Sequence, residues 1–274
     1  MRTPAIALVA AVSLFAFCTR ASGQEYATPA PRTTDLRRLH ALAIARAVHA
    51  YFTRGIADEQ RGAWDDAARS FEAVLALHPP EPQNSTARYD LAIAYAGLRR
   101  YDDAASQLRA ALRADPGFLA AWANLAAIDL RRGDLAEARD AARRLLALAP
   151  SSARGLYERG LIALQDGDLR AARTAFSTLA GSNPRYALAH YDLAVVLARS
   201  GDLAQAEREF RLALALAPRY ARASLGLGVV LVREGRLADA RAAFAAAAAE
   251  SADDPVLHVL ALSLERELEP PPAP

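Results

Sequence analysis

Cysteine is almost absent from this chain. The sequence holds one cysteine, Cys18, within an apolar segment near its start. A single cysteine cannot form a disulfide within the chain, and the chain would hold no thiol at all if that segment were removed. Disulfide and thiolate chemistry are therefore excluded from the mature protein, and its stability must come from side-chain packing.

An excess of either charge is also missing. The chain contains no lysine, and its 33 basic and 31 acidic residues give a net charge of +2. Without Arg2 and Arg20, which precede the expected mature chain, the charges balance at 31 and 31. Nucleic acids and anionic membranes attract a basic excess on one protein face, so neither is an expected partner. The arginine-only usage and the abundant alanine favour a GC-rich bacterial genome as the source.

Motifs of catalysis or cofactor binding are lacking as well. The sequence has no HExxH, P-loop or GxSxG pattern. Its histidines lack the i, i+4 pairing of a helical zinc site; they are His40, His49, His78, His190 and His258. The lone Gly226-Leu227-Gly228 is interpreted as a place of close helix packing rather than as a phosphate loop. We therefore predict no enzyme activity, no cofactor and no metal.

The N-terminal segment has the pattern of an export signal. A basic residue precedes the apolar run 5–18, and Ala21-Ser22-Gly23 supplies the small residues that signal peptidase reads. The run is too short to cross a bilayer, which takes about 20 residues, so no transmembrane segment is expected to remain. We expect cleavage near Gly23-Gln24 and an exported protein, periplasmic or secreted. Phe17 departs from the small residue that precedes a lipidated cysteine, which disfavours lipid attachment to Cys18.

The residues that are present repeat with a fixed period. Four prolines follow one another at intervals of 34 residues: Pro116, Pro150, Pro184 and Pro218. An alanine column runs in step, with one longer first interval: Ala67, Ala104, Ala138, Ala172, Ala206 and Ala240. Such a period indicates a solenoid of stacked repeats.

Each period contains two amphipathic helices. Apolar residues recur at helical spacing in two blocks, for example in residues 89–95 and 101–112. Between the blocks stand Gly133-Asp134, Gly167-Asp168 and Gly201-Asp202. Glycine can adopt the left-handed conformation that ends a helix, and aspartate can cap the next one. The repeat unit is therefore predicted to be a helix-turn-helix.

This 34-residue unit resembles the tetratricopeptide repeat (TPR). The resemblance covers about residues 48–254 and includes small residues in the first helix, at Gly55, Ala92, Ala126, Gly160, Ala194 and Gly228. The second helix supplies Phe71, Leu108, Ala142, Phe176, Phe210 and Phe244. Arg88, His190 and Ser224 depart from the large residue that the family often has at one first-helix position, whereas Trp122 keeps it.

The resemblance implies an all-α fold, a right-handed α-solenoid of about six units with a C-terminal capping helix. The approximate units are 48–81, 85–118, 119–152, 153–186, 187–220 and 221–254, and the capping helix is 255–267. The solenoid as a whole is expected at 34–267. A signal peptide at 1–23 and a flexible linker at 24–33 precede it, and a disordered Pro-rich tail at 268–274 follows.

In this family the first helices line a concave groove that holds a peptide. On this register the groove has an aromatic column beside an aliphatic one, which suits apolar anchors of a peptide. The candidate peptide-binding residues are Phe52, Ile56, Tyr89, Ile93, Asn124, Tyr157, Leu161, Tyr191, Val195, Leu225 and Val229. Aromatic residues at helical spacing also commonly form core, and the sequence leaves these two readings open.

The aliphatic column disfavours one known mode of binding. Family members that clamp a C-terminal carboxylate place asparagine and basic residues in the groove, where this chain has aliphatic residues. Arg131, Arg199 and Arg233 form a column at the ends of first helices, where cations complement the helix dipole. They are interpreted as solvated caps.

The resemblance implies a non-catalytic scaffold or adaptor of the bacterial cell envelope, with a protein or peptide partner. One alternative is a structural protein that self-associates through the ends of its solenoid. Another is an accessory subunit of an envelope enzyme or export complex.

Overall fold

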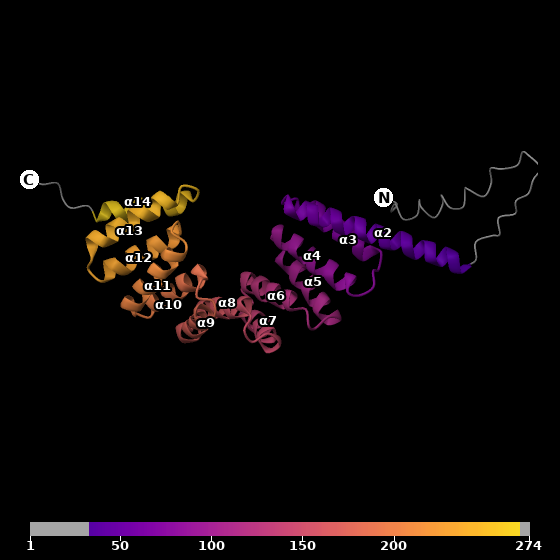
Figure 1. The fold of residues 1–274 in the computed structure, drawn as a ribbon, viewed down its shortest axis with the longest axis horizontal. Coiled ribbons are helices and arrows are strands. Elements are labelled where there is room, and N and C mark those ends of the chain that lie inside the picture. The colour runs from indigo at the N-terminus through magenta and orange to yellow at the C-terminus, as the bar shows by residue number, and fades with distance from the viewer. Residues whose placement is uncertain (1–32, 269–274) are drawn as a thin grey trace, which may run out of the picture. The chain divides into compact units, whose positions relative to one another are not determined.

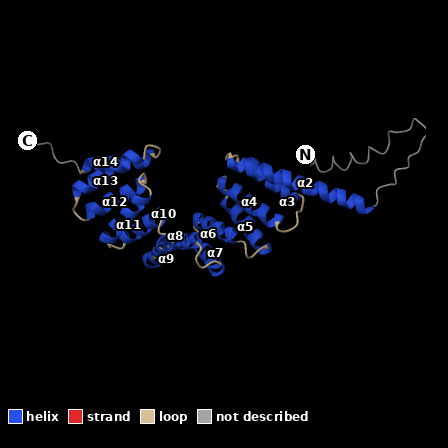
Figure 2. Cartoon of the chain, viewed as in Figure 1, coloured by secondary structure: helices blue, strands red, loops and turns tan. Residues whose placement is uncertain are grey.

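The computed structural model describes residues 33–268, and they form helices and loops with no strand (Figures 1 and 2). The chain divides into two compact units, residues 1–44 and 45–274. In the first unit only residues 33–44 are described, and they form the start of α2. The predicted signal peptide, residues 24–32 of the linker and residues 269–274 of the tail lie outside the described residues. Two boundaries differ from the prediction: Thr33 is already helical, and Leu268 packs beside the core residue Phe244.

First and second helices alternate along the chain, and a final helix follows them. The first helices of the repeats are α2 (Thr33–Gln60), α4 (Gln83–Gly97), α6 (Leu119–Arg132), α8 (Ala153–Gln165), α10 (Ala187–Arg199) and α12 (Ala221–Arg233). The second helices are α3 (Trp64–Ala76), α5 (Tyr101–Ala114), α7 (Leu135–Leu148), α9 (Leu169–Ser182), α11 (Leu203–Leu216) and α13 (Leu237–Glu250). The closing helix is α14 (Pro255–Glu267).

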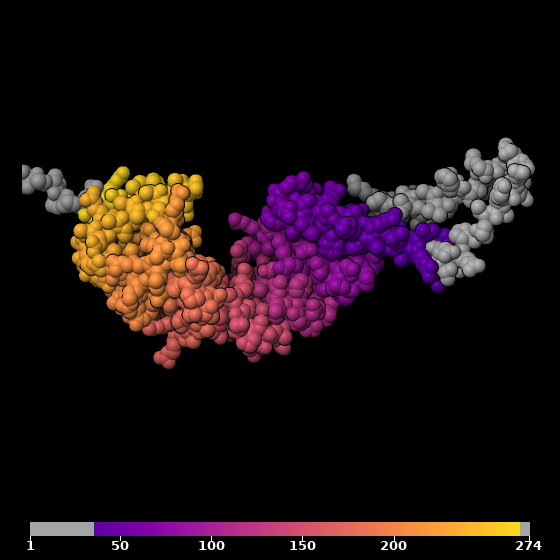
Figure 3. Space-filling model, in the orientation of Figure 1, coloured from indigo at the N-terminus to yellow at the C-terminus, as the bar shows by residue number. Residues whose placement is uncertain are grey.

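From α3 onward, each helix packs mainly on its neighbours in the chain. Figure 3 shows the corresponding pattern on the surface, where the colour changes steadily with residue number across residues 45–268. Contacts between chain neighbours are the defining property of a solenoid. The predicted all-α repeat solenoid is thus confirmed.

Several repeats close around a buried phenylalanine of the second helix. Phe71, Phe176 and Phe244 are fully buried. A Cβ atom at the facing glycine would lie only 2.4–2.7 Å from the ring: at Gly55 for Phe71, at Gly160 for Phe176 and at Gly228 for Phe244. Glycine is required because any side chain would collide with the ring. This explains Gly228 by helix packing, as predicted.

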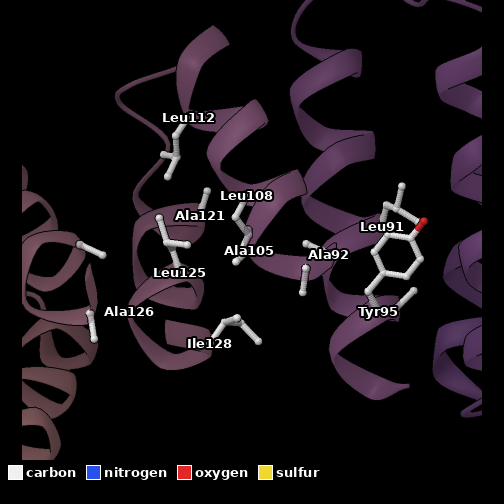
Figure 4. Packing of buried hydrophobic residues seen from close by; sticks show 14 of the residues in the cluster. Leu91, Ala92, Tyr95, Ala105, Leu108, Leu112, Ala121, Leu125, Ala126 and Ile128 are labelled. Atoms are coloured by element: carbon white, nitrogen blue, oxygen red, sulfur yellow. The ribbon is translucent and has the colours of Figure 1, made fainter. Parts of the chain in front are cut away.

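The packing between α4, α5 and α6 shows the same principle with smaller side chains. Leu91, Leu108 and Leu125 come from these three helices and are buried in one cluster (Figure 4). Ala92, Ala105 and Ala126 fill the spaces between them. Leucine against alanine lets the helices approach closely while the apolar volume stays filled.

The buried apolar core divides into two clusters that meet in α8. One buried cluster lies within residues 67–162 and another within residues 156–230. Ala142 of α7 stands where the other repeats have phenylalanine or leucine, and it lines a cavity of about 310 Å³ with Leu146 and Ile162. The small side chain leaves this junction incompletely filled.

The turns agree with the prediction in part. Gly133 ends α6 with a φ of +82°, and Gly167 and Gly201 also adopt positive φ. Among the three predicted aspartate caps, only Asp168 caps its helix, by accepting a hydrogen bond from the Ala171 amide at 2.9 Å. Asp134 instead pairs with Arg132 at 2.9 Å, and Asp202 pairs with Arg173 at 3.3 Å. Nearby arginines thus compete with the helix N-terminus for these carboxylates.

The departures from the family's large first-helix residue are accommodated by hydrogen bonds. Trp122 donates from Nε1 to the Pro116 carbonyl at 2.9 Å. The His190 ring contacts the equivalent Pro184 carbonyl through Nε2 at 3.0 Å and Glu209 through Nδ1 at 2.7 Å. A polar ring thus takes the place of an apolar one because its nitrogens are bonded within the repeat.

No helix within residues 33–268 is both long enough and apolar enough to cross a bilayer.

Candidate functional site

The aromatic column lies at the boundary between core and surface. Phe52, Tyr157 and Tyr191 each pack edge-on against the buried phenylalanine of the same repeat, with ring centroids 5.9–6.1 Å apart. All three side chains remain partly exposed. The two readings left open by the sequence therefore both apply, because one edge of each ring belongs to the core and the rest is accessible.

A second aromatic layer, which the sequence analysis missed, extends this column. Phe118, Tyr186 and Tyr220 lie in the loops that lead into first helices. They contact Tyr89, Tyr157 and Tyr191 with ring centroids 4.9, 6.5 and 4.9 Å apart, respectively. The signal was present in the sequence, since each of these residues follows a repeat proline by two positions.

The aliphatic column is the more exposed of the two. Ile56 and Val229 are each 44% exposed, and Ile93, Leu161 and Val195 are half-buried. None of the predicted peptide-binding residues is fully buried. We call the surface formed by these predicted residues the first-helix face.

Polar side chains lie beside the aromatic column. Asn124, a predicted site residue, forms a side-chain hydrogen bond with Tyr89. The position equivalent to Asn124 is Asp90 in the preceding repeat, and Glu158 and Asp192 in the two repeats that follow. The sequence analysis did not single out these carboxyl groups, because their burial depends on the neighbouring repeats.

Glu158 and Asp192 occupy equivalent positions with different surroundings. Burial raises the pKa of Glu158, but Arg154 pairs with it at 2.6 Å and Arg131 also favours its charged form. In the repeat that contains Asp192, the position equivalent to Arg154 is Leu188, which cannot form an ion pair. Burial therefore raises the pKa of Asp192 to about 7, opposed only by a hydrogen bond from Tyr157. Its Oδ2 atom is buried and makes no hydrogen bond among the described residues.

A second pair of carboxyl groups lies toward the N-terminal end of the first-helix face. Burial raises the pKa of Asp90 to about 6. Burial and the nearby Asp90 together raise the pKa of Glu59 to about 7. Part of this face is consequently protonated near neutral pH, so its charge depends on pH within the physiological range.

The first-helix face contains a cavity of about 530 Å³ between α10 and α12. Four of the predicted residues line it, namely Tyr191, Val195, Leu225 and Val229. Three arginines complete its wall: Arg199, Arg222 and Arg233. Arg233 donates a hydrogen bond to the Ala198 carbonyl, at the end of the preceding first helix. The arginines of the column at the first-helix ends were predicted to cap the ends of their own helices. Arg233 instead binds the C-terminal end of the preceding first helix, α10. We call this space the arginine cavity.

Within residues 33–268, histidine, cysteine and carboxylate side chains form no cluster of three or more that could hold a metal ion. What the first-helix face offers is apolar contact area, tyrosine hydroxyls and arginine guanidinium groups. Such a surface is suited to binding a polypeptide segment.

The comparison with protein-family models decides the family. The tetratricopeptide repeat model matches residues 52–117, 89–153, 157–220 and 197–255, which is most of the chain. The chain belongs to the tetratricopeptide repeat family. TPR proteins generally act as scaffolds that bind other proteins, and this coarse function applies to this TPR protein too.

Solved structures agree with this family. This TPR protein is similar to a thermophilic TPR protein from Thermus thermophilus, with 26% identity, a TM-score of 0.56, and coverage of 66% of this chain and 98% of that one. It is also similar to pilF of Pseudomonas aeruginosa, with 17% identity, a TM-score of 0.66, and coverage of 81% and 99%. At this lower identity the likeness concerns the fold alone. No curated protein sequence matches this chain.

Proposed function

We propose that this TPR protein is a non-catalytic scaffold that binds a peptide segment of a partner protein on its first-helix face. The observation that carries the proposal is the arginine cavity, in which residues from both predicted columns meet. Tyr191, Val195 and Val229 come from different turns and helices, yet they line one space. Their exposed apolar area is available to anchor side chains of a partner.

The test is selection from a library of random 12-residue peptides on the purified full chain. The double variant Val195→Glu/Val229→Glu is expected to weaken binding of the selected peptides at least about tenfold, because charges would enter an apolar contact. Affinities are measured by fluorescence anisotropy.

A control places the same two charges on exposed apolar positions of a second helix. Leu212→Glu/Leu216→Glu in α11 should leave peptide affinity unchanged, since both leucines are exposed away from the cavity. Selected peptides that bind the Val195→Glu/Val229→Glu variant as well as the parent would contradict the proposed face. Failure to select any peptide, together with a molecular size that grows with concentration, would favour self-association instead.

We also propose that the protein works in the bacterial cell envelope after export. The support is the sequence pattern of residues 1–23, with its short apolar run and small residues before Gln24. The intact mass of the protein purified from its native host is expected to correspond to a chain that begins at Gln24. A mass that still includes Met1, or a lipid on Cys18, would exclude this processing.

A further inference from the structure

Glu158 forms an ion pair with one arginine, and the charge of a second arginine from the preceding first helix also favours its ionised form. Its carboxylate lies 2.6 Å from Nε of Arg154 in α8. Arg131, at the end of α6, also favours the charged form of Glu158 and lowers its pKa against the effect of burial. Glu158 itself is 2% exposed. The repeat thus contains a buried carboxylate whose charge two arginines favour, one of them through an ion pair.

Two repeats later the arginines recur and the carboxylate does not. A shift of 68 residues places Arg199 at the position of Arg131, Arg222 at that of Arg154, and Gly226 at that of Glu158. Arg222 and Gly226 lie in α12, and Arg199 ends the preceding first helix, α10. The cationic part of the arrangement is therefore retained without the anion.

The structure explains why glycine replaces the acid. A Cβ atom at Gly226 would lie 2.5 Å from Cζ of Phe210. The residue equivalent to Phe210 two repeats earlier is Ala142. With Phe210 in its observed place, position 226 has no room for a side chain, and no carboxylate stands there.

The space beside Gly226 is the arginine cavity. Arg199, Arg222 and Gly226 all line it, and no acidic side chain does. Within residues 33–268, the side chains of Arg199 and Arg222 form neither a salt bridge nor a hydrogen bond. Asp192, in α10 with Arg199, is buried and does not line the cavity. Arg222 also lines a second cavity with Glu250, Asp253 and Asp254, but it forms no salt bridge with them. The guanidinium groups of Arg199 and Arg222 therefore have no carboxylate partner within residues 33–268.

We propose that the arginine cavity receives the side-chain carboxylate of a glutamate or aspartate from the bound segment, in place of the missing equivalent of Glu158. This inference rests on the proposed function. The aliphatic wall of Val195, Leu225 and Val229 calls for aliphatic residues on either side of the acid. A side chain within a segment fits better than a chain end, because the group being replaced is itself the side chain of a glutamate within a helix. The pairing resembles the bonds that guanidinium groups form with carboxylates elsewhere in proteins.

The experiment uses peptides from the library selection, resynthesised with acetylated and amidated ends. An acidic residue with aliphatic neighbours is expected to recur among them. Replacing that acid with its amide, and separately introducing Arg199→Gln/Arg222→Gln into the full chain, should each weaken binding about tenfold. Combining both changes should cost no more than either alone, because they remove the same contact.

The matched control removes two exposed arginines from second helices. Arg170→Gln/Arg208→Gln changes the net charge equally, at positions in α9 and α11 outside the cavity. It should leave affinity unchanged at about 0.15 M salt, where charges at a distance are screened.

The outcomes separate this inference from the proposed function. Peptides that need Val195 and Val229 but lack an acid, or that are insensitive to Arg199→Gln/Arg222→Gln, would overturn the carboxylate inference and leave the binding face intact. Binding that requires a free C-terminus would overturn it as well. Failure to select any peptide would overturn the proposed function and this inference together.

Discussion

Phe176→Ala is expected to lower the free energy of unfolding by about 3–5 kcal/mol, the largest effect of any single substitution considered for this protein. Phe176 is fully buried and packs edge-on against Tyr157, with ring centroids 6.1 Å apart. Its ring lies where a side chain at Gly160 would be, 2.5 Å from the position of that missing Cβ. Truncation would leave a cavity that Gly160 has no side chain to fill, so the cost belongs at the upper end for a core phenylalanine.

Urea unfolding followed by circular dichroism measures this effect. Tyr186→Ala is the matched control, since Tyr186 also contacts the Tyr157 ring but is 38% exposed. Its loss should cost less than about 1 kcal/mol. If Phe176→Ala cost no more than Tyr186→Ala, the phenylalanine would not hold the repeat together, and the assigned packing of α8 on α9 would be wrong.

Asp192→Asn is expected to stabilise the protein relative to the parent as the pH rises. Burial raises the pKa of Asp192 to about 7 in the folded chain, against about 3.9 for an ordinary aspartate. The folded state therefore holds the proton more tightly than the unfolded state. The resulting stability is fully present below about pH 4 and is lost as the pH rises to about 7, because a charged carboxylate without a cation becomes buried.

The asparagine side chain does not titrate and avoids this loss. Between about pH 5 and pH 8.5 the free energy of unfolding of the variant should gain about 2–3 kcal/mol on that of the parent. Glu59 and Asp90 titrate in the same range in both proteins, so their contributions cancel in the comparison. Asp253→Asn, at an exposed loop position, controls for the loss of a carboxyl. A difference between parent and Asp192→Asn that is the same at both pH values would show that Asp192 has an ordinary pKa.

The fold could be predicted from the sequence because the repeat is written in local, regularly spaced residues. Glycine at the turn, alanine in the second helix and proline at the close of each unit recur every 34 residues. Each of these residues acts on its own repeat or the next, so the period is enough to derive the helix pairs and their stacking. The phenylalanine and glycine pairs, such as Phe176 with Gly160, follow from the same register.

The candidate site was predictable only in outline. The two columns of the first-helix face follow from helical spacing, but the contacts of Phe118, Tyr186 and Tyr220 depend on how loops fold back over the next repeat. The number of aspartates that cap a helix was overestimated for a similar reason, since three were predicted and only Asp168 does so. Whether Asp134 binds a helix terminus or Arg132 depends on a competition between two nearby partners.

The repeat family, the helix pairs and the aromatic and aliphatic columns of the first helices follow from the sequence alone. The tertiary structure decided which polar groups are buried and which charges find partners, because burial and pairing arise between repeats. Glu158 and Asp192 occupy the same position in the repeat, yet only Glu158 forms an ion pair with an arginine. Arg199 and Arg222 likewise share their positions with Arg131 and Arg154, but the position equivalent to Glu158 is Gly226, where the observed Phe210 ring leaves no room for a side chain.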